Sequence, residues 1–184
     1  MTLELICAGF GGQGVLTMGM MLVQAGMKKG LNVLFYPSYG SEMRGGTANC
    51  SVKISDKRIP SPVCKQPDVL IAMNSPALDK FEPRMKSGGL ILVNSSIVPD
   101  ERPFRSDLRI VRVPAQSIAQ AHDNPTGQNI VILGAFAAMT GLFSPDFLQQ
   151  AIEGYFAAKG KVNPRNALCF RGGVEAAEAQ KGSA

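Results

Sequence analysis

The sequence predicts an α/β fold of the Rossmann-like type, with an open, mostly parallel sheet, helices on both faces and a helical C-terminus. Three observations support this class. Short apolar segments alternate along the chain with segments of helical periodicity. A glycine-rich turn separates the first apolar segment from the first helical one. The 184 residues are enough for one core, and no Pro/Ser-rich linker divides them.

The first elements are a strand, a turn and a closely packed helix. Residues 3–8 form a short apolar run that ends at glycine, which predicts a strand. Residues 15–29 have helical spacing and a face of small residues that includes Gly19 and Gly26. We therefore expect this helix to lie close against the sheet.

Three more strands are predicted in the first half of the chain. Residues 30–40 follow a glycine stop and read as the second strand. Residues 47–56 alternate polar and apolar side chains, which indicates a strand with one exposed face. Residues 67–74, "PDVLIAMN", are apolar and read as a buried strand.

A helix and two further strands follow. The helix over residues 75–86 is expected to have Ser75 as its cap and Pro76 at its first position. Residues 88–96 predict another buried strand, and residues 108–115 a strand ended by proline.

The C-terminal third is predicted to be helical. A short helix is expected at residues 117–122, and a strongly apolar one at 128–141 that belongs either to the core or to a partner surface. An amphipathic helix follows at 144–160, and a last one at 163–180 with an interruption at Gly172–Gly173. We expect a single domain over residues 1–184, with a helical tail from about 145 to 184.

Composition excludes several classes of function. The net charge of +5 comes from scattered basic residues and tryptophan is absent, so no nucleic-acid partner is expected. No apolar run approaches the ~20 residues that cross a bilayer, and the N-terminus lacks the basic region of a signal peptide, so we expect a cytoplasmic protein. With 45% hydrophobic and 18% charged residues, the surface is expected to be covered by a permanent partner.

The four cysteines do not form a metal-binding pattern. Cys7, Cys50, Cys64 and Cys169 are far apart in sequence and none belongs to a C-x-x-C pair. We interpret them as buried thiols, and we expect the chain to bind no metal and no iron–sulfur cluster.

The turn "GFGGQG" is the first candidate site. Its glycines fit the G-x-G-x-x-G spacing that cradles a dinucleotide pyrophosphate, with Gly12 and Gln13 inside the motif. A dinucleotide site also needs an acidic residue at the end of the second strand, and here that strand ends in Tyr36, Pro37 and Ser38. The turn is thus a nucleotide site, another anion site, or a tight turn needed only for packing.

A second unusual stretch is "YPSYGSEMRGG". Arg44 precedes Gly45 and Gly46, so a forked cation stands beside backbone that a ligand can approach closely. This combination suits a phosphate or a carboxylate. Taken alone, the stretch is also consistent with a hairpin connection whose arginine lies in solvent.

Together the two stretches carry a family resemblance. "GFGGQGV" followed by "YGSEMRGG" and "SVKISDKRIPSP" resembles the gamma subunits of 2-oxoacid:ferredoxin oxidoreductases. The likeness continues through "PDVLIAMN", "VRVPAQSIA" and "NIVILGAF", and covers roughly residues 3–160.

This resemblance implies a multi-subunit enzyme that decarboxylates a 2-oxoacid and forms acyl-CoA while reducing ferredoxin. Thiamine diphosphate and Mg are then held by the alpha and beta subunits, and iron–sulfur clusters by delta. The gamma chain covers the active site and helps to bind coenzyme A, with no catalytic residue of its own. The expected contacts come from the two motifs and are Gly11, Gly12, Gln13, Gly14, Arg44, Gly45 and Gly46.

Two other classes of function remain open on the residues alone. One is a free-standing NAD-binding oxidoreductase, and the other a non-enzymatic assembly module. Among single polar residues, Asn74 ends a strand where α/β sheets bind ligands. Asn129 is expected to cap a helix and His122 to lie at the surface. The acid itself, whether pyruvate, 2-oxoglutarate, a branched-chain acid or an aryl pyruvate, is not specified by the sequence.

Overall fold

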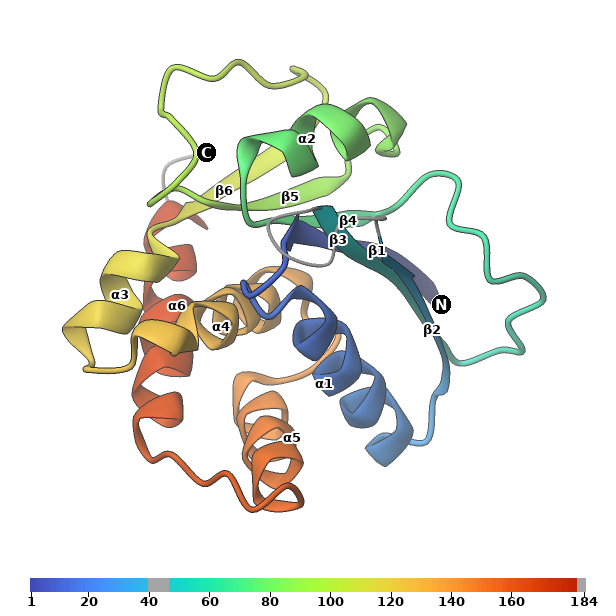
Figure 1. The fold of residues 1–184 in the computed structure, drawn as a ribbon. Helices are drawn as coiled ribbons and strands as arrows, with labels where there is room; N and C mark the ends of the chain where they lie inside the picture. Colours follow the sequence, from blue (N-terminus) through green and yellow to red (C-terminus); the bar gives the residue numbers. More distant parts are fainter. Residues whose placement is uncertain (40–46, 182–184) are drawn as a thin grey trace.

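The computed structural model describes residues 1–39 and 47–181. One sheet carries helices on both faces (Figure 1). Its strands are β1 (Thr2–Phe10), β2 (Asn32–Tyr39), β3 (Thr47–Ser55), β4 (Val69–Ala72), β5 (Leu90–Asn94) and β6 (Arg109–Val113). The helices are α1 (Val15–Lys28), α2 (Ser75–Phe81), α3 (Ala115–Ala121), α4 (Gln128–Thr140), α5 (Pro145–Ala157) and α6 (Arg165–Lys181). Short 3₁₀ turns are η1 (Glu82–Arg84) and η2 (Pro125–Gly127).

The strand order confirms the predicted α/β class. The sheet runs β2-β3-β1-β4-β5-β6, and β1, β4, β5 and β6 are parallel. Only β3 runs antiparallel to both of its neighbours.

The position of β3 differs from the prediction of a strand with an exposed face. It lies between β1 and β2, and most of its residues are buried. The polar Lys53 that suggested exposure is only 5% exposed, because its ammonium donates to the Glu4 carboxylate on β1 at 2.7 Å. A buried ion pair between neighbouring strands therefore produces the same alternation of polar and apolar residues as a strand with one face in solvent.

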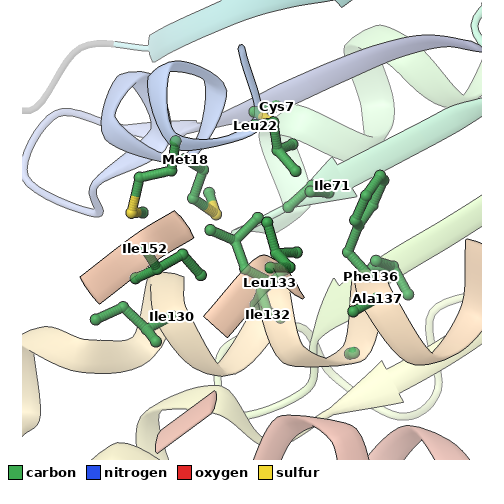
Figure 2. Close-up of a cluster of buried hydrophobic side chains, with 14 of the residues drawn as sticks. Cys7, Met18, Leu22, Ile71, Ile130, Ile132, Leu133, Phe136, Ala137 and Ile152 are labelled. Carbon is green, nitrogen blue, oxygen red and sulfur yellow. The ribbon is translucent and has the colours of Figure 1, made fainter. Parts of the chain in front are cut away.

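The two faces of the sheet build two cores. Alternate residues of β1, such as Leu5 and Cys7, face the core that α1, α4, α5 and α6 cover, while Ile6 and Ala8 face the core under α2. Figure 2 shows the larger core, where side chains of α4, including Leu133, meet residues of α1 and the sheet.

The apolar helix α4 belongs to the core. It is buried continuously from Asn129 to Ala137, so its apolar surface is used inside the chain and not for a partner. The next wall of this core is α6, which lies against α4 (Figure 1).

The predicted interruption of the last helix is wrong. Helix α6 runs through Gly172 and Gly173 without a break. A Cβ at Gly173 would overlap the carbonyl oxygen of Val131 on α4, and one at Gly134 would overlap that of Phe170 on α6. These glycines therefore let two helix backbones approach closely, and they do not end the helix. No helix among the described residues is long and apolar enough to span a membrane.

Candidate functional site

The glycine turn joins β1 to α1 at the carboxyl edge of the parallel strands. Gly11 and Gly12 are exposed, and Gly12 and Gly14 have φ values of 94° and 72°. These left-handed conformations are the ones that glycine adopts without strain. Gly14 is the N-cap of α1 and offers no side chain to the first turn of the helix. The positive end of the α1 dipole is therefore open to an anion or to ribose hydroxyls.

Gln13 holds this turn in place. Its Oε1 accepts from the Phe10 amide at 2.7 Å and from Asn74 Nδ2 at 3.2 Å, while its Nε2 donates to the Met73 carbonyl at 3.3 Å. The side chain thus ties the end of β1 to the end of β4. Its oxygen is engaged within the protein, so the geometry favours a positioning role over the predicted ligand contact.

The described residues on either side of the second motif lie at the same edge of the sheet as the glycine turn. Arg44, Gly45 and Gly46 lie outside the described residues. The strands on either side of them are in register with β1, because Thr47 is opposite Phe10 and Tyr39 is opposite Ala48. The chain therefore leaves and re-enters the described structure beside the glycine turn.

Asparagines end two neighbouring strands at this edge. Asn74 follows β4, and its Oδ1 accepts from the Ala77 amide at 2.9 Å, so Asn74 is the cap of α2 in place of the predicted Ser75. Asn94 ends β5, is fully buried, and donates through Nδ2 to Gln128 Oε1 at 3.4 Å. Asn94 was not among the predicted site residues, although "LIAMN" and "LILVN" repeat the same pattern of a buried strand ending in asparagine.

The hydrogen bonds found around the turn among the described residues involve amides and backbone groups. His122 is the C-cap of α3, and its ring lies beside Gly172 of α6. In the same described part of the chain, no three His, Cys, Asp or Glu side chains are grouped to hold a metal. This chemistry suits recognition of a polar or anionic ligand, because amides and helix ends stabilise charge without transferring protons.

All four cysteines are buried. Cys7 and Cys50 are opposite each other on β1 and β3, and their hydrogen bond together with burial raises the pKa of Cys7 well above its usual value. Cys64 belongs to the other core and Cys169 to α6. Thiols placed this way do not fit an iron–sulfur cluster, which takes four cysteine ligands at one place.

Comparisons with known proteins agree with these features. The profile of the family described as pyruvate ferredoxin/flavodoxin oxidoreductase matches residues 4–176. The chain is 42% identical over 170 residues to the ketoisovalerate oxidoreductase subunit VorA of Methanothermobacter thermautotrophicus. The aligned region covers 91% of this chain and 35% of VorA. It thus spans about a third of that relative's length. It is 33% identical over 177 residues to the 2-oxoglutarate synthase subunit KorC of Methanocaldococcus jannaschii, covering 95% of this chain and 94% of KorC.

Two solved structures share the fold. The gamma subunit of a keto/oxoacid ferredoxin oxidoreductase from Geobacter sulfurreducens superposes with a TM-score of 0.78 and 29% identity, over 96% of this chain and 99% of that one. The 2-oxoglutarate:ferredoxin oxidoreductase from Magnetococcus marinus, solved with 2-oxoglutarate, coenzyme A and succinyl-CoA bound, has a TM-score of 0.86 and 24% identity. This alignment covers 97% of this chain and 31% of the larger one.

Proposed function

The chain belongs to the pyruvate ferredoxin/flavodoxin oxidoreductase family, and we propose that it works as the gamma subunit of a 2-oxoacid:ferredoxin oxidoreductase in the cytoplasm. The complete enzyme would decarboxylate a 2-oxoacid oxidatively, form acyl-CoA and reduce ferredoxin. The resemblance to gamma subunits that the motifs predict is confirmed, because relatives of the same length and fold are subunits of such enzymes. The observation that supports the proposal most directly is the exposed glycine turn at the start of α1.

In this proposal the turn contacts coenzyme A. Gly11, Gly12 and Gly14 would let the ligand approach the backbone, and the α1 dipole would stabilise its phosphates. Gln13 would hold the turn, while Arg44 with Gly45 and Gly46 would add a bidentate cation from the segment that enters beside Phe10. The Magnetococcus enzyme of the same fold binds coenzyme A, which is consistent with this assignment.

The remaining chemistry would belong to partner chains. Thiamine diphosphate with Mg would be held by alpha and beta subunits, and iron–sulfur clusters by a delta subunit. The scattered, buried cysteines of this chain support that division for the clusters. Ferredoxin would then receive its electrons through the complex.

The alternative of a free-standing NAD-binding oxidoreductase is not supported. The relatives of this chain are subunits of 2-oxoacid enzymes. In a dinucleotide-binding fold, the residue that binds the ribose lies at the end of the second strand, close to the glycine turn. In this sheet, β3 lies between β2 and β1. The end of the second strand therefore lies one strand further from the glycine turn than that site requires.

Replacing Arg44 in the assembled enzyme tests the proposal. A charge-assisted pair with phosphate contributes about 1–3 kcal/mol, so Arg44→Ala should raise the Michaelis constant for coenzyme A roughly 5- to 100-fold. The Michaelis constant for the 2-oxoacid and the rate at saturating coenzyme A should stay the same. Arg58→Ala, at an exposed position of the β3–β4 loop, is the matched control.

Two results would contradict the assignment of this site. One is an unchanged dependence on coenzyme A in the Arg44→Ala enzyme. The other is a complex that dissociates on a sizing column, which would place Arg44 at a subunit interface. The isolated chain, which should reduce no dye with any 2-oxoacid, provides the blank for these assays.

A further inference from the structure

Gly11 and Gly12 are the central residues of a β-turn that two hydrogen bonds close. The Gln13 amide donates to the Phe10 carbonyl at 3.2 Å, and the Phe10 amide donates to Gln13 Oε1 at 2.7 Å. Gly12 has a φ of 94°, and a positive φ at the third position is typical of a type II turn. No atom of the described residues lies within 4 Å of the place that a Cβ at Gly12 would take. The turn is therefore held at its ends and open at its tip.

The orientation of one side-chain amide sets the ends of this turn. Gln13 Oε1 also accepts from Asn74 Nδ2 at 3.2 Å, and Gln13 Nε2 donates to the Met73 carbonyl at 3.3 Å. With the amide reversed, its NH₂ group would face two donors and its oxygen would face a carbonyl. Only the observed orientation lets the Gln13 side chain accept from the Phe10 amide. Loss of this orientation would therefore open the turn.

Gly9 provides the room for this amide. A Cβ at Gly9 would lie 2.6 Å from Gln13 Oε1 and 2.8 Å from Met73 Cβ. The first glycine of the motif is therefore needed for the Gln13 side chain. In the same way Gly14 admits Asn129, whose side-chain amide would overlap an added Cβ. The outer glycines of the motif thus serve packing, which leaves the two central ones for a ligand.

Asn74 determines the orientation of Gln13. It is 1% exposed, and its Oδ1 accepts from the Ala77 amide at 2.9 Å at the start of α2. Because the oxygen is engaged in this cap, the Nδ2 group is the part of Asn74 that faces Gln13. This donor excludes the reversed Gln13 amide, whose NH₂ group would meet the NH₂ group of Asn74. A backbone amide of α2 therefore fixes, through two side chains, the turn that precedes α1.

Asn74 lies where the helices that follow β1 and β4 go to opposite faces of the sheet (Figure 1). Helix α1 covers the larger core and α2 the smaller one, and β1 and β4 are neighbouring parallel strands. Open α/β sheets bind ligands at such a point, outside the carboxyl ends of the strands. The hydrogen bond between Asn74 and Gln13 spans this point.

We infer that Asn74 is a positioning residue: through Gln13 it holds the glycine turn in the conformation that contacts the ligand. The inference rests on the proposed function, in which this ligand is coenzyme A. Asn74 is buried and is not expected to touch coenzyme A itself. Its effect should therefore disappear when Gln13 can no longer make hydrogen bonds.

Asn74→Ser tests the contact in the full chain without removing the cap, because serine caps a helix as well as asparagine does. The Phe10 and Gln13 amides, which close the turn, should exchange with deuterium roughly 5-fold faster or more. Amides of α2 should exchange as in the unaltered chain. Asn163→Ser is the matched control, because Asn163 also accepts from a backbone amide, that of Arg165, and donates to a side chain, but lies before α6. It should leave the turn unchanged.

In the assembled enzyme, Asn74→Ser should raise the Michaelis constant for coenzyme A about 3- to 10-fold. The Michaelis constant for the 2-oxoacid and the rate at saturating coenzyme A should stay the same. Gln13→Met keeps the size of the side chain and removes its amide, so it should raise the coenzyme A constant as well. The double variant should be no worse than Gln13→Met alone, because Asn74 acts through Gln13.

Three results would overturn the inference. The first is faster exchange throughout α2 with a protected turn, which would show that Asn74 only caps that helix. The second is a double variant in which the two effects on the coenzyme A constant add. The third is no effect of Asn74→Ser on this constant in an enzyme in which Arg44→Ala raises it, and the proposed function would then stand. If neither variant changes the constant while Phe10 and Gln13 exchange faster, the proposed ligand is wrong and the positioning of the turn by Asn74 is supported.

Discussion

Gln180 hydrogen-bonds both backbone groups of Arg112: the Arg112 amide donates to Gln180 Oε1 at 3.0 Å, and Gln180 Nε2 donates to the Arg112 carbonyl at 2.8 Å. Arg112 lies on β6, the outermost strand on its side of the sheet. A side chain from α6 therefore occupies the place of a seventh strand at this position. Edge strands with open backbone groups are sites of unwanted pairing, and this contact protects β6.

Gln180→Ala should lower the free energy of unfolding by about 1–2 kcal/mol, because two backbone groups lose their partners. It should also increase self-association at high concentration, since the edge of β6 is uncovered. Urea unfolding and sedimentation measure the two effects. Gln120→Ala, on the exposed face of α3, should change neither. An unaltered midpoint together with an unaltered sedimentation profile would refute the protective role.

Gly173→Ala should destabilise the protein by about 1–3 kcal/mol, although alanine ordinarily favours a helix. The reason is that an added Cβ overlaps the Val131 carbonyl and forces α4 and α6 apart. Gly154→Ala is the matched control within α5, where the new methyl meets only the mobile end of Lys28. Chemical unfolding should show a loss for the first variant and a neutral or stabilising effect for the second. The same sign for both would rule out the close helix contact.

Glu82 and Asp79 bind the same guanidinium with unequal effect. Arg102 donates to Glu82 Oε2 at 2.6 Å and to Asp79 Oδ1 at 2.9 Å, but the side chain of Glu82 is 8% exposed and that of Asp79 is 70% exposed. Glu82→Ala should cost about 2–3 kcal/mol of stability, because the largely buried Arg102 keeps only the exposed Asp79 as a carboxylate partner and the Arg105 amide loses its acceptor. Asp79→Ala should cost less than about 1 kcal/mol. If the Glu82→Ala and Asp79→Ala variants had equal midpoints in thermal unfolding, burial of the carboxylate would not determine how much each ion pair contributes to stability.

Cys64 should resist alkylation in the native protein. Burial and a hydrogen bond to the Glu4 carboxylate raise the pKa of its thiol to about 12, so it stays protonated at pH 8, where an unfolded cysteine begins to ionise. Mass spectrometry after iodoacetamide treatment should find Cys64 unmodified until urea is added. Rapid modification in the folded chain would contradict this.

The same pKa shift makes a pH-dependent contribution to stability. Since the folded pKa is raised, the contribution is complete below the ordinary value of 9.0 and is lost as the pH rises toward about 12. The melting temperature should therefore fall over this alkaline range. The fall should be smaller in a Cys64→Ser variant, whose hydroxyl does not titrate there.

Local signals predicted most elements, and contacts distant in sequence explain the differences. The glycine turn and α1 follow from a strand, a glycine run and a helical period within the first 29 residues. The place of β3 depends on pairing with β1, whose residues are 37 (Phe10–Thr47) to 53 (Thr2–Ser55) positions away in sequence, and no short window contains both. Gly172 and Gly173 read locally as a helix breaker, and only the presence of α4 shows why glycine is needed.

The residues of the candidate site also separate into those that a local pattern predicts and those that depend on contacts distant in sequence. The glycine spacing predicted the turn between β1 and α1, and the structure shows that Gly11 and Gly12 are exposed in it. The hydrogen bond from Gln13 reaches the end of β4, 60 residues away in sequence, so no local pattern predicts it. The prediction of Asn129 as a helix cap is wrong, because α4 has Gly127 as its N-cap without a side-chain cap and Asn129 packs against Gly14, which is distant in sequence.

The covering of α4 by α6 also bears on how the chain is made. A ribosome releases α4, with its unbroken run of buried side chains, before the residues of α6 that close over it have been joined. Until then the backbone groove at Gly134 is uncovered, and a large apolar helix faces water. Interrupted translation upstream of Arg165 would consequently yield a fragment whose sheet is complete but whose centre is open, a natural substrate for chaperones and proteases.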